Sequence, residues 1–178
     1  CMEPVICVYM LSGPEAIALL AAPEYKGAVY VFPPVAASVS FSFIYTLYIN
    51  AEFYFEKTSY VMLVSLLGAA LNIALNYMFI PIYGYVAAAY TTVFCYALFA
   101  AGHYFLHRLI LKKQGIKEQV FNSKLILLYS VVVTAFMLIC TLLYQNNIIR
   151  YIVIGVIAVI CLFNIKRLIK VFKTALQK

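Results

Sequence analysis

The sequence predicts an all-α bundle of membrane-spanning helices. Hydrophobic residues make up 66% of the 178 residues and charged residues only 11%, whereas soluble domains are about one-quarter charged. Uncharged runs of about 20 residues, the length that crosses a bilayer as a helix, recur along the chain. These runs lack the alternation of apolar and polar residues that is typical of membrane barrel strands. A soluble helical bundle with an unusually apolar core would have too few charges to cover its surface.

The first 27 residues are expected to hold the end of a membrane helix and a loop on the outer face. Val5–Leu11 is apolar but too short to cross a bilayer, so it resembles the last part of a span. The chain opens on Cys1 rather than on Met, which suggests that a longer protein continues on its N-terminal side. Residues 1–27 therefore join an incomplete span to the first complete one.

A short helix is expected within that outer loop, in the stretch SGPEAIALLAAPEY. Pro14 suits the first turn of a helix, because its missing N–H would be unpaired there in any case. Glu15 complements the positive end of the helix dipole, and Pro23 is expected to stop the helix.

Five complete spans and a basic tail are expected to follow. The spans are predicted at residues 28–49, 59–80, 85–106, 125–144 and 149–165, and the tail occupies residues 166–178. Pro33 and Pro34 either start the first span or kink it. The fifth span is short, with an uncharged core at Tyr151–Ile165, and reaches full length if the first basic residues of the tail snorkel to the headgroups.

A tight hairpin is expected between the second and third spans. The connecting residues read IPIYG. Pro81 cannot continue the hydrogen-bond pattern of a helix, and Gly84 can adopt backbone angles that other residues avoid.

The basic residues orient the chain. The connectors before the second span and after the third, together with the tail, hold eleven of the 13 basic residues. These three segments share one side of the membrane, because two spans separate each from the next. The positive-inside rule places that side, with the C-terminus, in the cytoplasm, and leaves only Lys26 and Arg150 outside. The stretch KRLIKVFK in the tail reports this topology or contacts anionic lipid; a nucleic-acid partner is not expected.

Residues for enzyme chemistry are scarce. The chain has no aspartate, no Ser–His–acid arrangement and no glycine-rich phosphate loop. His103 and His107 share one helix face, but two histidines do not make a metal box, so we interpret them as interfacial side chains. We therefore expect no enzyme activity, no metal and no cofactor.

Two polar groups inside the spans are candidates for lining a transport path. Asn72 and Asn76 are one helical turn apart, and Gly68 precedes them on the same stripe, where it would let a neighbouring helix come close. An amide is costly in hydrocarbon, so this face is expected to look at other helices or at a wet cavity. Either the amides hold helices together or they contact a transported substrate.

The first span carries the second polar group. Ser38, Ser42 and Thr46 follow one another at intervals of four residues, and Asn50 continues the stripe. Small hydroxyls commonly pack between membrane helices, so both a structural role and a substrate-path role stay open.

Three stretches give the chain a resemblance to a known family. The stretches GPEAIALLAAPEYKGAVYVFPPVAAS, NAEFYFEKTSY and LNIALNYMFIPIYGYVAAAYTT resemble the C-terminal half of polysaccharide flippases of the multidrug/oligosaccharidyl-lipid/polysaccharide exporter superfamily. The similarity covers roughly residues 10–110 and is nearest to the bacterial O-antigen and capsule repeat-unit flippases.

The resemblance implies a fold and a function. The chain would be one six-helix lobe of a two-lobed transporter, with five full spans and the end of a sixth, and would need the N-terminal lobe of the same protein as its partner. Such a multi-pass transporter lies in the bacterial cytoplasmic membrane and flips an undecaprenyl-pyrophosphate-linked oligosaccharide for surface polysaccharide biosynthesis. In this chain Asn50, Asn72, Asn76 and the hydroxyl stripe would be the candidate glycan contacts. No Arg or Lys is expected deep in a span, so the other lobe would supply cations for the diphosphate.

Other functions are weighed against this one. A cation-coupled multidrug exporter of the same superfamily is the first alternative, but such exporters typically bury an acid in the membrane and none is expected here. A membrane enzyme such as a glycan polymerase or glycosyltransferase is disfavoured by the missing aspartates and the short outer loops. A scaffold subunit without transport activity is the last alternative.

Overall fold

A computed structural model describes residues 3–116 and 121–163, and every regular element in these two ranges is a helix. The expectation of an all-α protein is thus confirmed. The elements in chain order are α1 (Glu3–Leu11), α2 (Gly13–Leu20), the 3₁₀-helix η1 (Pro23–Val31), α3 (Phe32–Tyr54), α4 (Thr58–Tyr83), α5 (Val86–Lys113), α6 (Ser123–Leu143) and α7 (Asn147–Phe163).

Four helical stretches are long and apolar enough to cross a membrane. They are Glu24–Tyr54, in which η1 continues into α3, and then α4, α5 and α6. The fifth predicted span, 149–165, overlaps α7, whose 17 residues end at Phe163. The rest of that span and the whole predicted tail, 166–178, lie outside the described residues. The chain is therefore an all-helical protein whose helices fit a bilayer.

The chain divides into two compact units. A central unit comprises residues 34–137 and includes α3 from Pro34, α4, α5 and most of α6. A terminal unit combines residues 1–33 with residues 138–178, so its described helices are α1, α2, η1, the end of α6 and α7.

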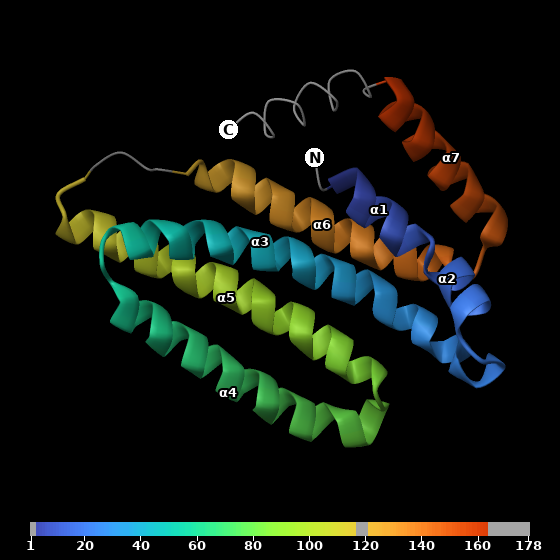
Figure 1. Ribbon diagram of the computed structural model, residues 1–178, viewed down its shortest axis with the longest axis horizontal. Coiled ribbons are helices and arrows are strands. Elements are labelled where there is room, and N and C mark those ends of the chain that lie inside the picture. Colours follow the sequence, from blue (N-terminus) through green and yellow to red (C-terminus); the bar gives the residue numbers. More distant parts are fainter. Residues whose placement is uncertain (1–2, 117–120, 164–178) are drawn as a thin grey trace. The chain divides into compact units, whose positions relative to one another are not determined.

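In the central unit, α4 and α5 form an antiparallel hairpin (Figure 1). Gly84 ends α4 with a φ of 71°, the left-handed backbone that was expected of it. The expectation that Pro81 ends the helix is wrong, because α4 continues to Tyr83. Pro81 lies in the last turn, where its missing N–H removes only one hydrogen bond.

Small residues set the close packing of this hairpin. A Cβ atom placed on Gly68 would lie 2.1 Å from the ring of Phe99 in α5. One placed on Gly102 in α5 would lie 3.3 Å from Val64 in α4. Gly68 thus lets the neighbouring helix approach, as expected, but the space is filled by an aromatic ring rather than by backbone.

The opposite face of α4 is apolar and exposed. Val61 is the one residue of this helix that is buried among the described residues. Large apolar side chains such as Leu66, Leu67 and Ile73 are more than half exposed. A water-facing helix carries polar residues on this face, so hydrocarbon is the solvent that suits α4.

In the terminal unit, the outer segment folds as two helices rather than one. α2 ends at Leu20, and η1 begins at Pro23. Pro23 therefore starts a helix instead of only stopping one, which corrects the expectation. The end of α2 and the start of η1 at Pro23 have one cause. A residue before proline avoids the helical region of backbone angles, and Ala22 is accordingly extended with a ψ of 154°.

Pro33 and Pro34 lie at the start of α3, at the junction where η1 continues into it. Both lie in its first turn and both are fully buried. The first turn tolerates proline because its N–H groups have no partner within the helix.

Candidate functional site

A buried hydrogen bond between Glu52 and His103 joins α3 to α5 inside the central unit. Nδ1 of His103 lies 2.8 Å from Oε2 of Glu52, and both side chains are 0% exposed. A carboxylate can only accept a hydrogen bond, so with Glu52 ionised the imidazole N–H donates it. The two residues are 51 positions apart in the chain. This pair, with His107 one turn further along α5, forms what we call the Glu–His cluster.

The local sequence explains why these side chains turn inward. Phe41, Tyr48 and Glu52 recur at intervals of seven and four residues, so they lie on one face of α3, and all three are buried. α3 continues to Tyr54, so this face extends beyond the predicted end of the first span at residue 49. On α5, His103 and His107 are likewise one turn apart and 0% and 4% exposed.

Aromatic rings surround the cluster. Tyr45 of α3 stacks on His103, with ring centroids 6.0 Å apart. The ring centroids of Tyr48 and His107 are 5.6 Å apart, and those of Phe121 and His107 are 5.8 Å apart. The α3–α5 contact is thus made of large rings, whereas the α4–α5 contact depends on glycines.

Four buried polar atoms of the cluster have no hydrogen-bond partner among the described residues. They are Oε1 of Glu52, Nε2 of His103 and both ring nitrogens of His107. Buried polar atoms are nearly always paired, so this concentration marks a candidate functional site. No group of three or more His, Cys, Asp or Glu side chains in residues 3–116 and 121–163 could hold a metal ion.

The histidines were interpreted as interfacial side chains, and the structure shows that both are buried among other side chains of the protein. The sequence carried a partial signal, since the two histidines share a face and Glu52 shares one with buried aromatics. What it could not supply was the pairing of those two faces.

The predicted amide pair also lies at a helix contact. Nδ2 of Asn76 donates to Oδ1 of Asn72 at 3.0 Å, and the hydroxyl of Thr91 in α5 donates to Oδ1 of Asn76 at 2.5 Å. Both amides are half-buried. The bond between Thr91 and Asn76 links α5 to α4 and helps to hold the hairpin together.

The hydroxyl stripe of the first span does not act as a unit. Ser38 is buried, and its hydroxyl donates to the backbone carbonyl of Val35, one turn earlier in α3, at 2.7 Å. Thr46 is exposed, and its hydroxyl donates to the backbone carbonyl of Ser42 at 2.8 Å. The Ser42 residue is half-buried. Asn50 is exposed. Among the described residues, no hydrogen bond joins the hydroxyl stripe or Asn50 to Asn72 or Asn76, so the two predicted polar groups do not form one site.

An ion pair lies in the terminal unit. Arg150, near the start of α7, is 2% exposed and donates from Nη2 to Oε1 of Glu15 on α2. The hydroxyl of Tyr151 donates to the same oxygen at 2.7 Å. Arg150, which the charge pattern predicted on the outer side of the membrane, is thus a buried cation.

The fold and the Glu–His cluster define a class: an all-helical protein that has helices long and apolar enough to span a membrane and that encloses ionisable side chains. Comparison with protein-family models, with curated proteins and with solved structures gives no match to the chain.

Proposed function

We propose that the chain is a lobe of a membrane transporter that flips a lipid-linked oligosaccharide across the bacterial cytoplasmic membrane. The nature of the cargo rests on the resemblance of residues 10–110 to polysaccharide flippases. The four helices of membrane-spanning length support a transmembrane location. The proposal includes a second lobe as partner, a cytoplasmic C-terminus and no catalytic reaction.

The observation that carries a transport role is the complete burial of Glu52 and His103. Ionisable side chains among membrane helices are costly, and they commonly mark ion or proton pathways. A buried Glu–His pair between two helices of membrane-spanning length therefore supports a transport role.

Aromatic side chains enclose the pair. Tyr45 of α3 stacks on His103, and Tyr48 of α3 contacts His107. Separation of α3 from α5 would therefore expose Glu52 and the two histidines to water.

The cation-coupled multidrug exporter gains support from the same pair. The argument against it was the lack of a buried acid, and Glu52 is a buried acid in a membrane-spanning helix. Glu52 lies 20 residues after Phe32, which is about 30 Å along a helix. That distance places it near one end of the hydrocarbon layer rather than at its middle. The flippase therefore remains the first proposal.

The test is complementation of a strain that lacks the full-length gene. Lipid-linked oligosaccharide should accumulate in the cytoplasmic leaflet of the deletion strain, and the parent gene should restore surface polysaccharide. The double variant Glu52→Leu/His103→Phe should be made in normal amounts but fail to restore it. Glu56→Gln, an exposed acid just beyond α3, is the matched control.

Two outcomes would contradict the proposal. Full complementation by the double variant would exclude a transport role for the pair. Increased drug sensitivity of the deletion strain without accumulation of lipid-linked oligosaccharide would favour the exporter instead.

A further inference from the structure

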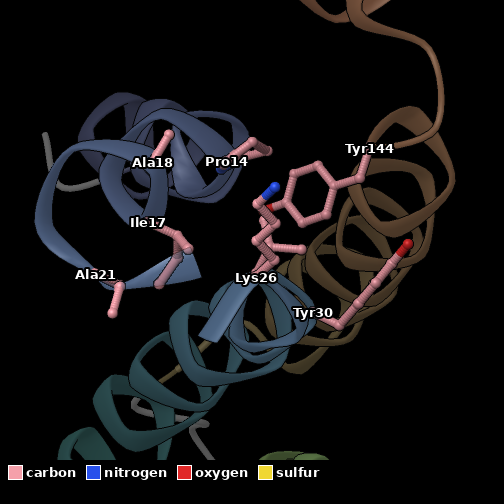
Figure 2. A pocket seen from close by; sticks show the side chains of 9 residues that line it. Pro14, Ile17, Ala18, Ala21, Lys26, Tyr30 and Tyr144 are labelled. Carbon is pink, nitrogen blue, oxygen red and sulfur yellow. The ribbon is translucent and has the colours of Figure 1, made fainter. Parts of the chain in front are cut away.

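A pocket in the terminal unit is independent of the Glu–His cluster and of the cargo. It has a volume of about 340 Å³ and lies between α2, η1 and the residue that follows α6. Its walls are Pro14, Ile17, Ala18, Ala21, Ala22, Lys26, Val29, Tyr30 and Tyr144. Figure 2 shows the Lys26 side chain running up between Pro14 and Tyr144, with its ammonium group in the pocket.

The ammonium group is an uncompensated charge. No hydrogen bond or ion pair joins Lys26 to another described residue. Glu15, the acid on α2, already accepts hydrogen bonds from Arg150 and Tyr151. Lys26 is the one charged residue among those that line the pocket, so the pocket wall favours a negatively charged group.

The positive-inside pattern makes this lysine unusual. Lys26 and Arg150 are the two basic residues that the pattern leaves on the outer side. Arg150 is neutralised by Glu15 within the protein. Lys26 has no such local partner, so its charge is available to a group from outside the protein.

The rest of the pocket is apolar or aromatic. Proline, isoleucine, valine and alanine side chains supply most of the wall. The hydroxyl of Tyr144 already donates to the carbonyl of Met10, so it does not supply a second donor for an anion. Figure 2 shows the hydroxyl of Tyr30 directed away from Lys26. One cation beside an apolar wall suits a ligand that carries a negative group on an apolar body.

We propose that this pocket binds an anionic phospholipid, with its phosphate on Lys26 and its glycerol and first methylenes against α2. η1 leads into a membrane-spanning helix, which places the pocket at the depth where headgroups meet hydrocarbon. A free phosphate ion would gain the charge contact but nothing from the apolar wall. A phospholipid gains both.

The test is native mass spectrometry of the full chain in detergent with dioctanoyl phosphatidylglycerol or dioctanoyl phosphatidylcholine. The anionic lipid should bind more tightly, and Lys26→Gln should weaken its binding about fivefold. Lys26→Arg keeps the charge and should retain binding. Lys57→Gln, a lysine of the central unit, is the control and should have no effect. Ala18→Phe should fill the pocket and weaken the binding of either lipid.

Three results would overturn the proposal. Equal affinity for the two lipids would remove the role of charge. An equal loss in Lys57→Gln and Lys26→Gln would show that binding is nonspecific. Complete displacement of the lipid by inorganic phosphate at the same concentration would show a site for the ion alone. Both Lys26 and Ala18 are exposed, so their variants should keep the parent's helical circular dichroism, which is measured alongside.

Discussion

His103 and Glu52 are joined by a hydrogen bond of 2.8 Å, and neither side chain reaches the surface. They come from helices whose contact is otherwise formed by aromatic rings. Bulky rings keep two helices further apart than glycines do, and this hydrogen bond is the specific polar link across that wider contact.

Removing one member of this pair should be more damaging than removing both. Glu52→Leu leaves a buried imidazole without its partner and should lower the free energy of unfolding by about 3–5 kcal/mol. The double variant Glu52→Leu/His103→Phe buries no polar atom at these positions and should recover most of that loss. The measurement is denaturant unfolding in detergent followed by circular dichroism. If the double variant is less stable than Glu52→Leu alone, the two residues are not coupled.

The amide link between α4 and α5 should have a small measurable energy. Asn76→Leu removes the bond from Thr91 and should cost about 0.6–1.7 kcal/mol, the range found for hydrogen bonds between membrane helices. Asn72→Leu should cost less, because Asn72 bonds only to Asn76 in the described contacts. A double-mutant cycle of Asn76→Leu with Thr91→Val isolates the bond. A coupling energy of zero would assign the amides to another role, such as contact with substrate.

Gly68 should not tolerate a methyl group. A Cβ atom there would overlap the Phe99 ring, so Gly68→Ala should destabilise the hairpin by about 1–3 kcal/mol. Phe99→Leu should rescue it by making room. Gly155→Ala on α7 is the control, because no atom lies within 4 Å of the added carbon, and it should be neutral or slightly stabilising. Equal changes in stability for Gly68→Ala and Gly155→Ala would show that helix propensity, and not packing against Phe99, determines the effect.

The Glu15–Arg150 pair should respond unequally to removal of its two members. Arg150 is 2% exposed and the Glu15 side chain is 40% exposed. Glu15→Ala leaves a buried cation without a partner and should cost about 3–5 kcal/mol. Arg150→Met leaves a carboxylate that water can still reach, so it should cost clearly less. Thermal unfolding of the two variants compares them, and the reverse order would mean that Arg150 is stabilised by other groups.

Several features of the fold follow from short-range patterns. The uncharged run 59–80 lies inside α4 and the run 85–106 nearly coincides with the first part of α5. Gly84 was expected to turn the chain and has the required positive φ. Helix limits near proline were less predictable: Pro81 falls inside a helix and Pro23 begins one, because a proline is tolerated wherever few helical bonds depend on it.

The candidate site was predicted much less completely. The inward direction of Asn72 and Asn76 followed from the cost of an amide in hydrocarbon. The sequence did not single out Glu52. It left a structural and a substrate-path role open for the stripe of Ser38, Ser42 and Thr46, and the hydroxyls of Ser38 and Thr46 bond to backbone carbonyls of their own helix. Periodicity shows which residues share a face, but it does not show which faces meet.

The sequence alone determined that the chain forms apolar helices long enough for a bilayer, since helix hydrogen bonds and hydropathy are properties of neighbouring residues. Only the tertiary structure decided that Glu52 meets His103, that Thr91 meets Asn76 and that Arg150 meets Glu15. The physical reason is that each of these bonds depends on the rotation and separation of two packed helices, which many side chains along both helices set together.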